Sequence, residues 1–142
     1  MKLVFACLAT CALLLATVLV SCQSESEIEY KRYYTIGKSV YQNQCKNCHA
    51  ENGEGLGGLI PSLQKADYLS KNKIKLACMV QNGLQGLIVV NGKFYNGKMP
   101  AQTQLAPIEI AEVITYITNS FGNKQGVYGL EKVSLDLGKC EL

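Results

Sequence analysis

The chain has 142 residues, which is enough for one domain, and a formal net charge of +3 at neutral pH. No cluster of basic residues interleaved with aromatic ones is present, so nucleic-acid binding has no support and we expect no such partner. Seven cysteines are many for this length, and their meaning depends on the redox compartment.

The N-terminal residues have the pattern of an export signal. Lys2 is followed by an apolar run from Leu3 to Val20, which ends at Ser21 and Cys22. A small residue directly before a cysteine resembles the cleavage box of bacterial lipoproteins, in which the cysteine is acylated. We therefore predict a lipoprotein signal peptide over residues 1–21 and lipidation at Cys22. The alternative is an uncleaved transmembrane anchor, because the run approaches membrane-spanning length.

Both interpretations place the rest of the chain on the periplasmic side of a bacterial membrane and tether it there. We predict a polar tether over residues 22–32, without an apolar period, and one domain over residues 33–142 with a C-terminal extension from about residue 124. Cys7 and Cys11 lie within the signal and would leave with it. The cysteines that remain for the mature chain are Cys22, Cys45, Cys48, Cys78 and Cys140.

The first part of the domain alternates helical and flexible segments. Helical spacing over residues 29–43 runs directly into a pair of cysteines. A glycine-rich stretch over residues 51–61 is too flexible for a helix interior and predicts a loop. Residues 67–81 predict a second helix, which Asn82 and Gly83 should end.

The second part begins with a predicted β-hairpin. Two β-favouring segments within residues 87–95 flank Asn91-Gly92, which is a strong hairpin signal. A second loop follows over residues 96–100. Residues 107–120 predict the clearest helix, because Pro107 suits its first position and a wide apolar stripe follows. Residues 130–142 have only weak helical spacing.

The sequence Cys45-Lys46-Asn47-Cys48-His49 matches the signature for attachment of c-type haem. On a helical turn, positions three apart share a face, so both thiols can reach the vinyl groups at one edge of a haem. His49 follows at once and would project toward the iron. The sequence therefore predicts one covalently bound haem c.

Zinc binding and thiol redox chemistry are the rival interpretations of this motif. A structural zinc site usually has two separated ligand pairs, whereas this chain has one Cys-x-x-Cys pair and a single histidine. A thioredoxin-like site would need a βαβ context, of which there is no sign. A third possibility is a purely structural lipoprotein in which the motif is accidental.

The single histidine means that the sixth ligand of the iron must be another residue, or that the position is open. Met/His ligation is the electron-transfer arrangement and raises the reduction potential. After signal removal only Met79 and Met99 remain. Met79 lies within a predicted helix, where methionine usually fills the core. Met99 lies in a loop with glycine and proline on either side, so we predict Met99 as the ligand.

The order of these features resembles the class I cytochrome c family over about residues 33–123. The resemblance implies an all-α cytochrome c fold with three to five helices around one covalent haem, and here a small β-hairpin inserted before the Met99 loop. It also implies that the Pro61 carbonyl accepts a hydrogen bond from His49 and so fixes the ring. The family crosses its first and last helices near a glycine and aromatic residues, for which Gly37, Tyr41 and Tyr116 are the candidates.

Cys78 and Cys140 are left once haem and lipid are assigned. In an oxidising compartment a disulfide between them is the prediction, and two separate buried thiols are the alternative. The bridge would close a loop of about sixty residues, which stabilises the fold by about 4 kcal/mol in the chain-entropy model.

The function that these features predict is electron transfer rather than enzymatic catalysis. A membrane-tethered cytochrome would pass single electrons to or from a terminal oxidase, a reductase or a quinol-oxidising complex. The alternative is a haem enzyme or gas sensor with a labile sixth ligand. A catalytic distal pocket usually offers a histidine or an arginine, whereas His49 is already used and Arg32, the only arginine, lies in the predicted tether.

Overall fold

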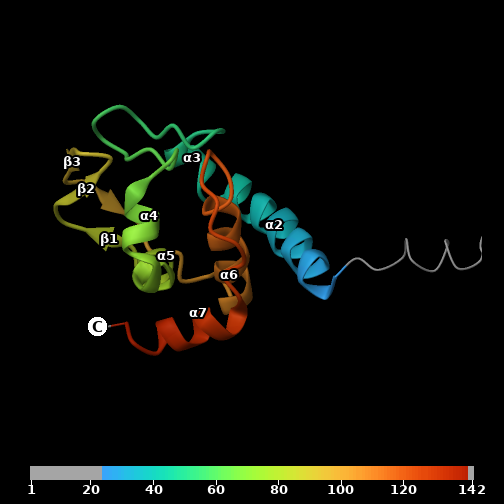
Figure 1. The fold of residues 1–142 in the computed structure, drawn as a ribbon. Coiled ribbons are helices and arrows are strands. Elements are labelled where there is room, and N and C mark those ends of the chain that lie inside the picture. The colour runs from blue at the N-terminus through green and yellow to red at the C-terminus, as the bar shows by residue number, and fades with distance from the viewer. Residues whose placement is uncertain (1–23, 141–142) are drawn as a thin grey trace, which may run out of the picture.

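The computed structural model describes residues 24–140, so the predicted signal peptide and Cys22 lie outside the described residues. The fold is mainly helical, with two small antiparallel strand pairs (Figure 1). In chain order the elements are α2 (Glu25–Gln44), α3 (Lys46–His49), α4 (Asp67–Lys71), a 3₁₀ turn (Lys73–Lys75), α5 (Leu76–Asn82), β1 (Leu84–Gln85), β2 (Ile88–Val90), β3 (Lys93–Tyr95), β4 (Lys98–Met99), α6 (Pro107–Ile117) and α7 (Leu130–Leu137).

The number of helices differs from the three to five that were expected, since residues 24–140 contain six α-helices. One reason is that the helix predicted over residues 67–81 is divided. Asn72 leaves the helical conformation, with φ −113° and ψ 26°, and its side-chain amide donates to the Tyr68 carbonyl at 3.0 Å. Asparagine competes for backbone groups in this way and so interrupts helices. The other reason is that α3 is a single turn of four residues.

Helix α2 begins at Glu25, so most of the segment predicted as a tether without periodic structure is helical. Ser24 caps the helix, because its hydroxyl accepts from the Glu27 amide at 3.3 Å. The carboxylates of Glu25 and Glu27 lie at the positive end of the helix dipole, and Lys31 pairs with Glu27 at 2.9 Å. These local interactions form a helix without any apolar period.

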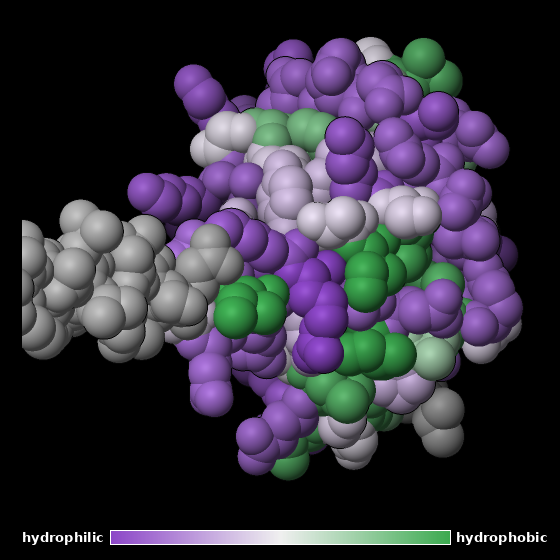
Figure 2. All heavy atoms as spheres, turned by 90° about the vertical axis from the view of Figure 1, so that its right-hand side faces the viewer, coloured by the Kyte–Doolittle hydropathy of each residue, from purple (hydrophilic) through white to green (hydrophobic). Residues whose placement is uncertain are grey.

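The first turns of α2 project beyond the body of the molecule (Figure 1), and residues 24–29 are all exposed. Figure 2 shows mainly hydrophilic side chains where the described chain begins. Within residues 24–140, none of the helices has the length and apolar character needed to cross a bilayer.

The core lies where α2 packs against α6. Tyr33, Val40 and Tyr41 are buried on α2, and every residue of α6 from Ile110 to Ile117 is buried. At the crossing, a Cβ atom on Gly37 would lie 1.9 Å from the carbonyl oxygen of Glu112. The two helices can therefore approach this closely only because residue 37 has no side chain.

Aromatic rings fill the space beside the crossing. The Tyr41 ring packs against Tyr116 and Phe121, with centroid distances of 5.3 and 5.4 Å. Tyr34 adds a further contact with Tyr116 at 5.1 Å. Tilted pairs at these distances are favourable beyond the burial of their area. Gly37, Tyr41 and Tyr116, which the resemblance singled out, thus meet at the crossing.

The strands form two separate antiparallel pairs. Strands β2 and β3 pair in the segment where a hairpin was expected, with Val89 opposite Phe94, and Asn91 and Gly92 turn with positive φ. Strands β1 and β4 pair Leu84 with Met99 and Gln85 with Lys98. The sequence carries no signal for this second pair, because each strand has only two residues.

The residues after α6 form a C-terminal arm (residues 124–140) that crosses the body and ends beside α5 (Figure 1). Tyr128 is buried in it and its hydroxyl hydrogen-bonds the Asp136 carboxylate, while its amide donates to Thr115 Oγ1 at 2.9 Å. A disulfide joins Cys140 at the end of the arm to Cys78 on α5. Of the two alternatives for these cysteines, the structure has the bridge.

Replacing Gly37 by alanine should destabilise the protein, although glycine to alanine within a helix is normally favourable. The new methyl group would meet the Glu112 backbone, which moves only with the whole of α6. We expect the free energy of unfolding to fall by about 3 kcal/mol. Guanidinium unfolding followed by circular dichroism measures it.

Gly138→Ala is the matched control, because its Cβ would find its nearest neighbour, the Ser134 carbonyl oxygen, at 3.6 Å. We expect this change to stay within about 0.5 kcal/mol. A Gly37→Ala protein as stable as the parent would contradict the close crossing.

Candidate functional site

A cavity of about 310 Å³ lies between the Cys-x-x-Cys-His motif and the strand that carries Met99. Its walls are formed by side chains from α2, α3, α4, α5, the β2–β3 hairpin and α6. The residues that line it are predominantly apolar, and include Leu63, Ala66, Leu69, Leu76, Val80, Leu84, Ile88, Val90, Pro100, Val113 and Ile117. Among the described lining residues none is Asp, Glu, Lys or Arg.

The motif is held in shape by the junction of two helices. Cys45 ends α2 and precedes the single turn of α3. The amides of Cys48 and His49 both donate to the Cys45 carbonyl, at 3.1 and 2.9 Å. One helical turn therefore brings Cys45, Cys48 and His49 to the wall of the same cavity.

The two cysteines of the motif differ in environment. Cys45 is half-buried and Cys48 is exposed. Burial, and to a lesser degree the neighbouring Cys48, raise the pKa of Cys45 to about 11. This thiol is therefore protonated at neutral pH, unlike the activated thiolate of a redox motif.

The surroundings of the motif also weigh against the rival interpretations. Within residues 24–140, no group of three or more His, Cys, Asp or Glu side chains is placed to hold a metal ion. The strands of the described chain are antiparallel pairs, whereas a thioredoxin-like motif requires a βαβ unit. Neither the zinc site nor the thiol redox site has support in this part of the chain.

His49 is oriented by the loop that follows the motif. Its Nδ1 atom lies 3.3 Å from the Pro61 carbonyl oxygen. Because a carbonyl only accepts, Nδ1 carries the proton and Nε2 is left with a lone pair for a metal. Burial lowers the pKa of His49, and the hydrogen bond to Pro61 opposes that shift. The ring is therefore neutral and directed by Pro61, as a haem ligand requires.

Two further residues shape this loop, in roles that the sequence did not predict. Gly55 donates its amide to the His49 carbonyl at 3.0 Å, and its φ is +72°. A Cβ atom on Gly55 would lie 2.8 Å from the Pro61 carbonyl oxygen, so only glycine fits beside the acceptor of His49. The Tyr41 hydroxyl donates to the Ala50 carbonyl at 2.7 Å and ties the loop to α2. The glycine-rich composition predicted a flexible loop, and only the folded chain places Gly55 against Pro61.

Both candidate methionines line the cavity. Met79, on α5, is partly buried and packs against the main hydrophobic core, as expected for a core residue. Met99 is on β4, in the segment that pairs with β1, and is not part of that core. The two methionines thus share the cavity and differ in that Met79 also packs against the core.

The β2–β3 hairpin forms one wall of the cavity through Ile88 and Val90. Its turn is fixed to the start of α4 by a reciprocal pair of hydrogen bonds. The Asn91 amide donates to Asp67 Oδ1 at 2.7 Å, and the Asp67 amide donates to Asn91 Oδ1 at 3.0 Å. Hydrogen bonds from Lys71 and, to a lesser extent, the Asn91 amide lower the pKa of Asp67. The β2–β3 hairpin is thus a fixed part of the site.

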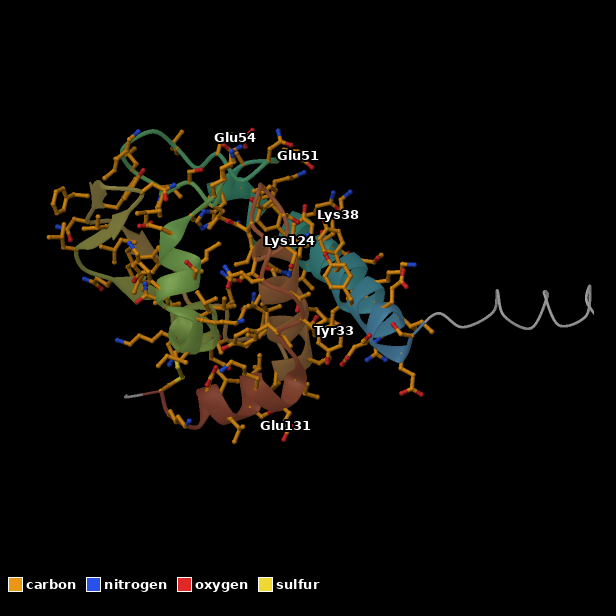
Figure 3. The ribbon with its side chains drawn as sticks, in the orientation of Figure 1. Tyr33, Lys38, Glu51, Glu54, Lys124 and Glu131 are labelled. Atoms are coloured by element: carbon orange, nitrogen blue, oxygen red, sulfur yellow. A yellow bond between two sulfur atoms is a disulfide. The ribbon has the colours of Figure 1, made fainter. Side chains whose placement is uncertain are left out.

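Charged side chains lie outside the cavity. Figure 3 shows Glu51 and Glu54 on the loop that follows α3, with Lys38 on α2. Glu51 pairs with Lys46 of the motif at 3.3 Å, and both side chains are exposed. An apolar interior with one histidine and two methionine thioethers, and charges only around it, fits a large flat apolar cofactor with a central metal ion.

Comparisons with known proteins agree with this geometry. The cytochrome c family model matches residues 34–120 of the chain. Cytochrome c-552 of Thermus thermophilus is 37% identical over 99 residues, which cover 67% of this chain and 75% of that protein. A second cytochrome c-552 from the same species is also 37% identical over 99 residues, which cover 67% of this chain and 66% of that protein.

The matched region runs from the middle of α2 to the end of α6, and so includes every residue named above as a wall of the cavity. The resemblance stated from the motif order is confirmed by these matches. The chain belongs to the cytochrome c family, as a class I c-type cytochrome with one covalently bound haem c.

Proposed function

We propose that this protein is an exported, membrane-tethered electron carrier whose haem iron is bound by His49 and Met99. Membership of the cytochrome c family supports electron transfer. The observation that carries the finer proposal is that the two cysteines of the motif, His49 and Met99 all line one apolar cavity.

Each residue has a distinct task in this proposal. Cys45 and Cys48 hold the cofactor by thioether bonds at one edge, because one turn of α3 presents both thiols to the cavity. The bound haem supplies an iron that gains and loses one electron. His49 binds through Nε2, since the Pro61 carbonyl engages the other ring nitrogen. Met99 would supply its thioether sulfur to the iron, and this pair of ligands would favour the reduced state.

The cavity wall suits a carrier better than an enzyme. With His49 and Met99 both bound to the iron, no position on it would be left for a substrate. The described lining residues include no acid, lysine or arginine that could move a proton or stabilise a developing charge. Arg32 is exposed on α2 and is not among the residues that line the cavity. The apolar wall limits the access of water and so influences the reduction potential.

The N-terminal part of the proposal rests on the sequence. A lipid on Cys22 would hold the chain at a membrane surface, and α2 begins three residues later at Glu25. The domain would then stand on the periplasmic side of a bacterial membrane. The partners that we propose are a terminal oxidase, a reductase or a quinol-oxidising complex. A membrane tether would raise the local concentration of the carrier near such a complex.

Replacing Cys45 and Cys48 together by alanine should abolish covalent attachment of haem. The parent protein, produced with the cytochrome c maturation machinery, should be red and keep its pigment in acidified acetone. The double variant should lack the haem mass in an intact mass spectrum.

The control is the double variant Cys78→Ala with Cys140→Ala, which removes the disulfide-bonded pair of cysteines that does not line the cavity. It should keep the covalent haem. A colourless parent protein would contradict the assignment of Cys45 and Cys48.

Met99→Ala should remove a sulfur-to-iron charge-transfer band in the far red of the oxidised spectrum. It should also lower the reduction potential, because Met/His ligation raises it. Spectroelectrochemical titration of the soluble fragment that starts after Cys22 measures both quantities.

Met79→Ala is the matched control, because Met79 lines the same cavity from α5. It should keep the band. A parent protein without the band, whose reduced form binds carbon monoxide rapidly, would instead favour the alternative of a haem enzyme or gas sensor with an open site.

The lipid anchor is tested on protein purified from membranes in detergent. Mass spectrometry should find an N-terminal peptide that begins at Cys22 and carries acyl chains. A peptide that runs uncut from residues before Cys22 to Ser24 would overturn the lipoprotein proposal in favour of an uncleaved anchor.

A further inference from the structure

The loop that carries Met99 lies on a ledge formed by the end of α5 and by β1 (residues 80–85). Leu84 on β1 pairs with Met99, and the neighbouring Gln85 pairs with Lys98. Farther along, the Gln102 amide donates to the Val80 carbonyl at 3.0 Å. The backbone on both sides of Met99 is therefore bonded to the ledge.

Gly83 lies at the centre of this contact. A Cβ atom on Gly83 would be 2.5 Å from the Met99 carbonyl oxygen and 2.9 Å from the Ala101 amide nitrogen. Both neighbours are backbone atoms, which cannot turn aside as a flexible side chain does. The φ of Gly83 is +78°, a conformation that side chains disfavour. Any side chain here would move the Met99 loop off the ledge.

We propose that Gly83 is the positioning residue for the sixth iron ligand. This inference rests on the proposed function, in which Met99 binds the iron. The missing side chain lets residues 99–101 lie directly on the end of α5, and this contact sets how far the Met99 backbone stands from the cavity. The ledge fixes the conformation of the Met99 loop before the metal binds, so the bond to iron is not needed to fix that conformation.

The test is Gly83→Ala in the holoprotein. The far-red charge-transfer band should be lost, the reduction potential should fall, and carbon monoxide should bind the reduced form faster than in the parent. In a Met99→Ala background the same substitution should leave the haem spectrum unchanged, because its effect acts through Met99.

Two glycines provide matched controls. Gly126 has the same φ of +78°, and Gly86, close to the ledge, has φ +111°, but a Cβ atom on either would have no neighbour within 4 Å. Gly126→Ala and Gly86→Ala carry the backbone strain without the contact, so both should keep the band. Loss of the band in all three variants would show a general effect of strain and overturn the inference.

A second measurement does not depend on the folding of Gly83→Ala. In Met99→Ala holoprotein, hydrogen exchange of the Gln102 amide should remain slow, because Val80 on the ledge holds it. Fast exchange would mean that the iron–sulfur bond orders the loop, which overturns the inference. A parent protein without the far-red band would refute Met99 ligation itself, whereas a band that survives Gly83→Ala refutes only the role of Gly83.

Discussion

The close crossing of α2 and α6 at Gly37 is the constraint on which the rest of the structure depends. Helix α2 is capped at its C-terminal end by Cys45, the first residue of the haem-binding motif. The angle and depth of its crossing with α6 therefore decide where the motif lies relative to the core. Tyr41 connects the two regions. Its ring packs on Tyr116 of α6, and its hydroxyl holds the Ala50 carbonyl just after the motif. A shift of the crossing would therefore move the motif and the loop that orients His49.

The other side of the cavity is built from short helices, strands and loops, some of whose side chains, such as Val90, are buried in the core. Hydrogen bonds between these segments add to that packing. Asp67 and Asn91 exchange hydrogen bonds that fix the hairpin, and the end of α5 supports the Met99 loop. Such contacts hold short segments in place without closing the cavity, which leaves apolar side chains directed at the cofactor. The site thus combines a rigid helical half, which carries the attachment motif and His49, with a bonded loop half, which carries Met99.

The C-terminal arm reinforces the loop half from outside. Asp136 is buried and accepts hydrogen bonds from Tyr128 and Lys132. Burial is the largest single influence on its pKa and raises it. The hydrogen bonds and the nearby lysines together outweigh burial, so the pKa of Asp136 is lowered. The disulfide between Cys78 and Cys140 then joins the end of the arm to α5, the helix whose last residues support the Met99 loop. The arm lies outside residues 34–120, which the family model matches.

The sequence by itself determined the features that are local. The Cys-x-x-Cys-His spacing identified the cofactor, and Pro107 with the apolar stripe after it identified α6, because covalent chemistry and helical periodicity act over a few neighbouring residues. Only the tertiary structure decided which distant backbones meet. Nothing local places Gly83 against Met99, Gly55 against Pro61, or Asp67 against Asn91, because each contact joins segments whose approach depends on how the helices pack. The start of α2 at Glu25, capped by Ser24, and its division from α3 were also not predicted, since caps and single turns leave no apolar period to detect.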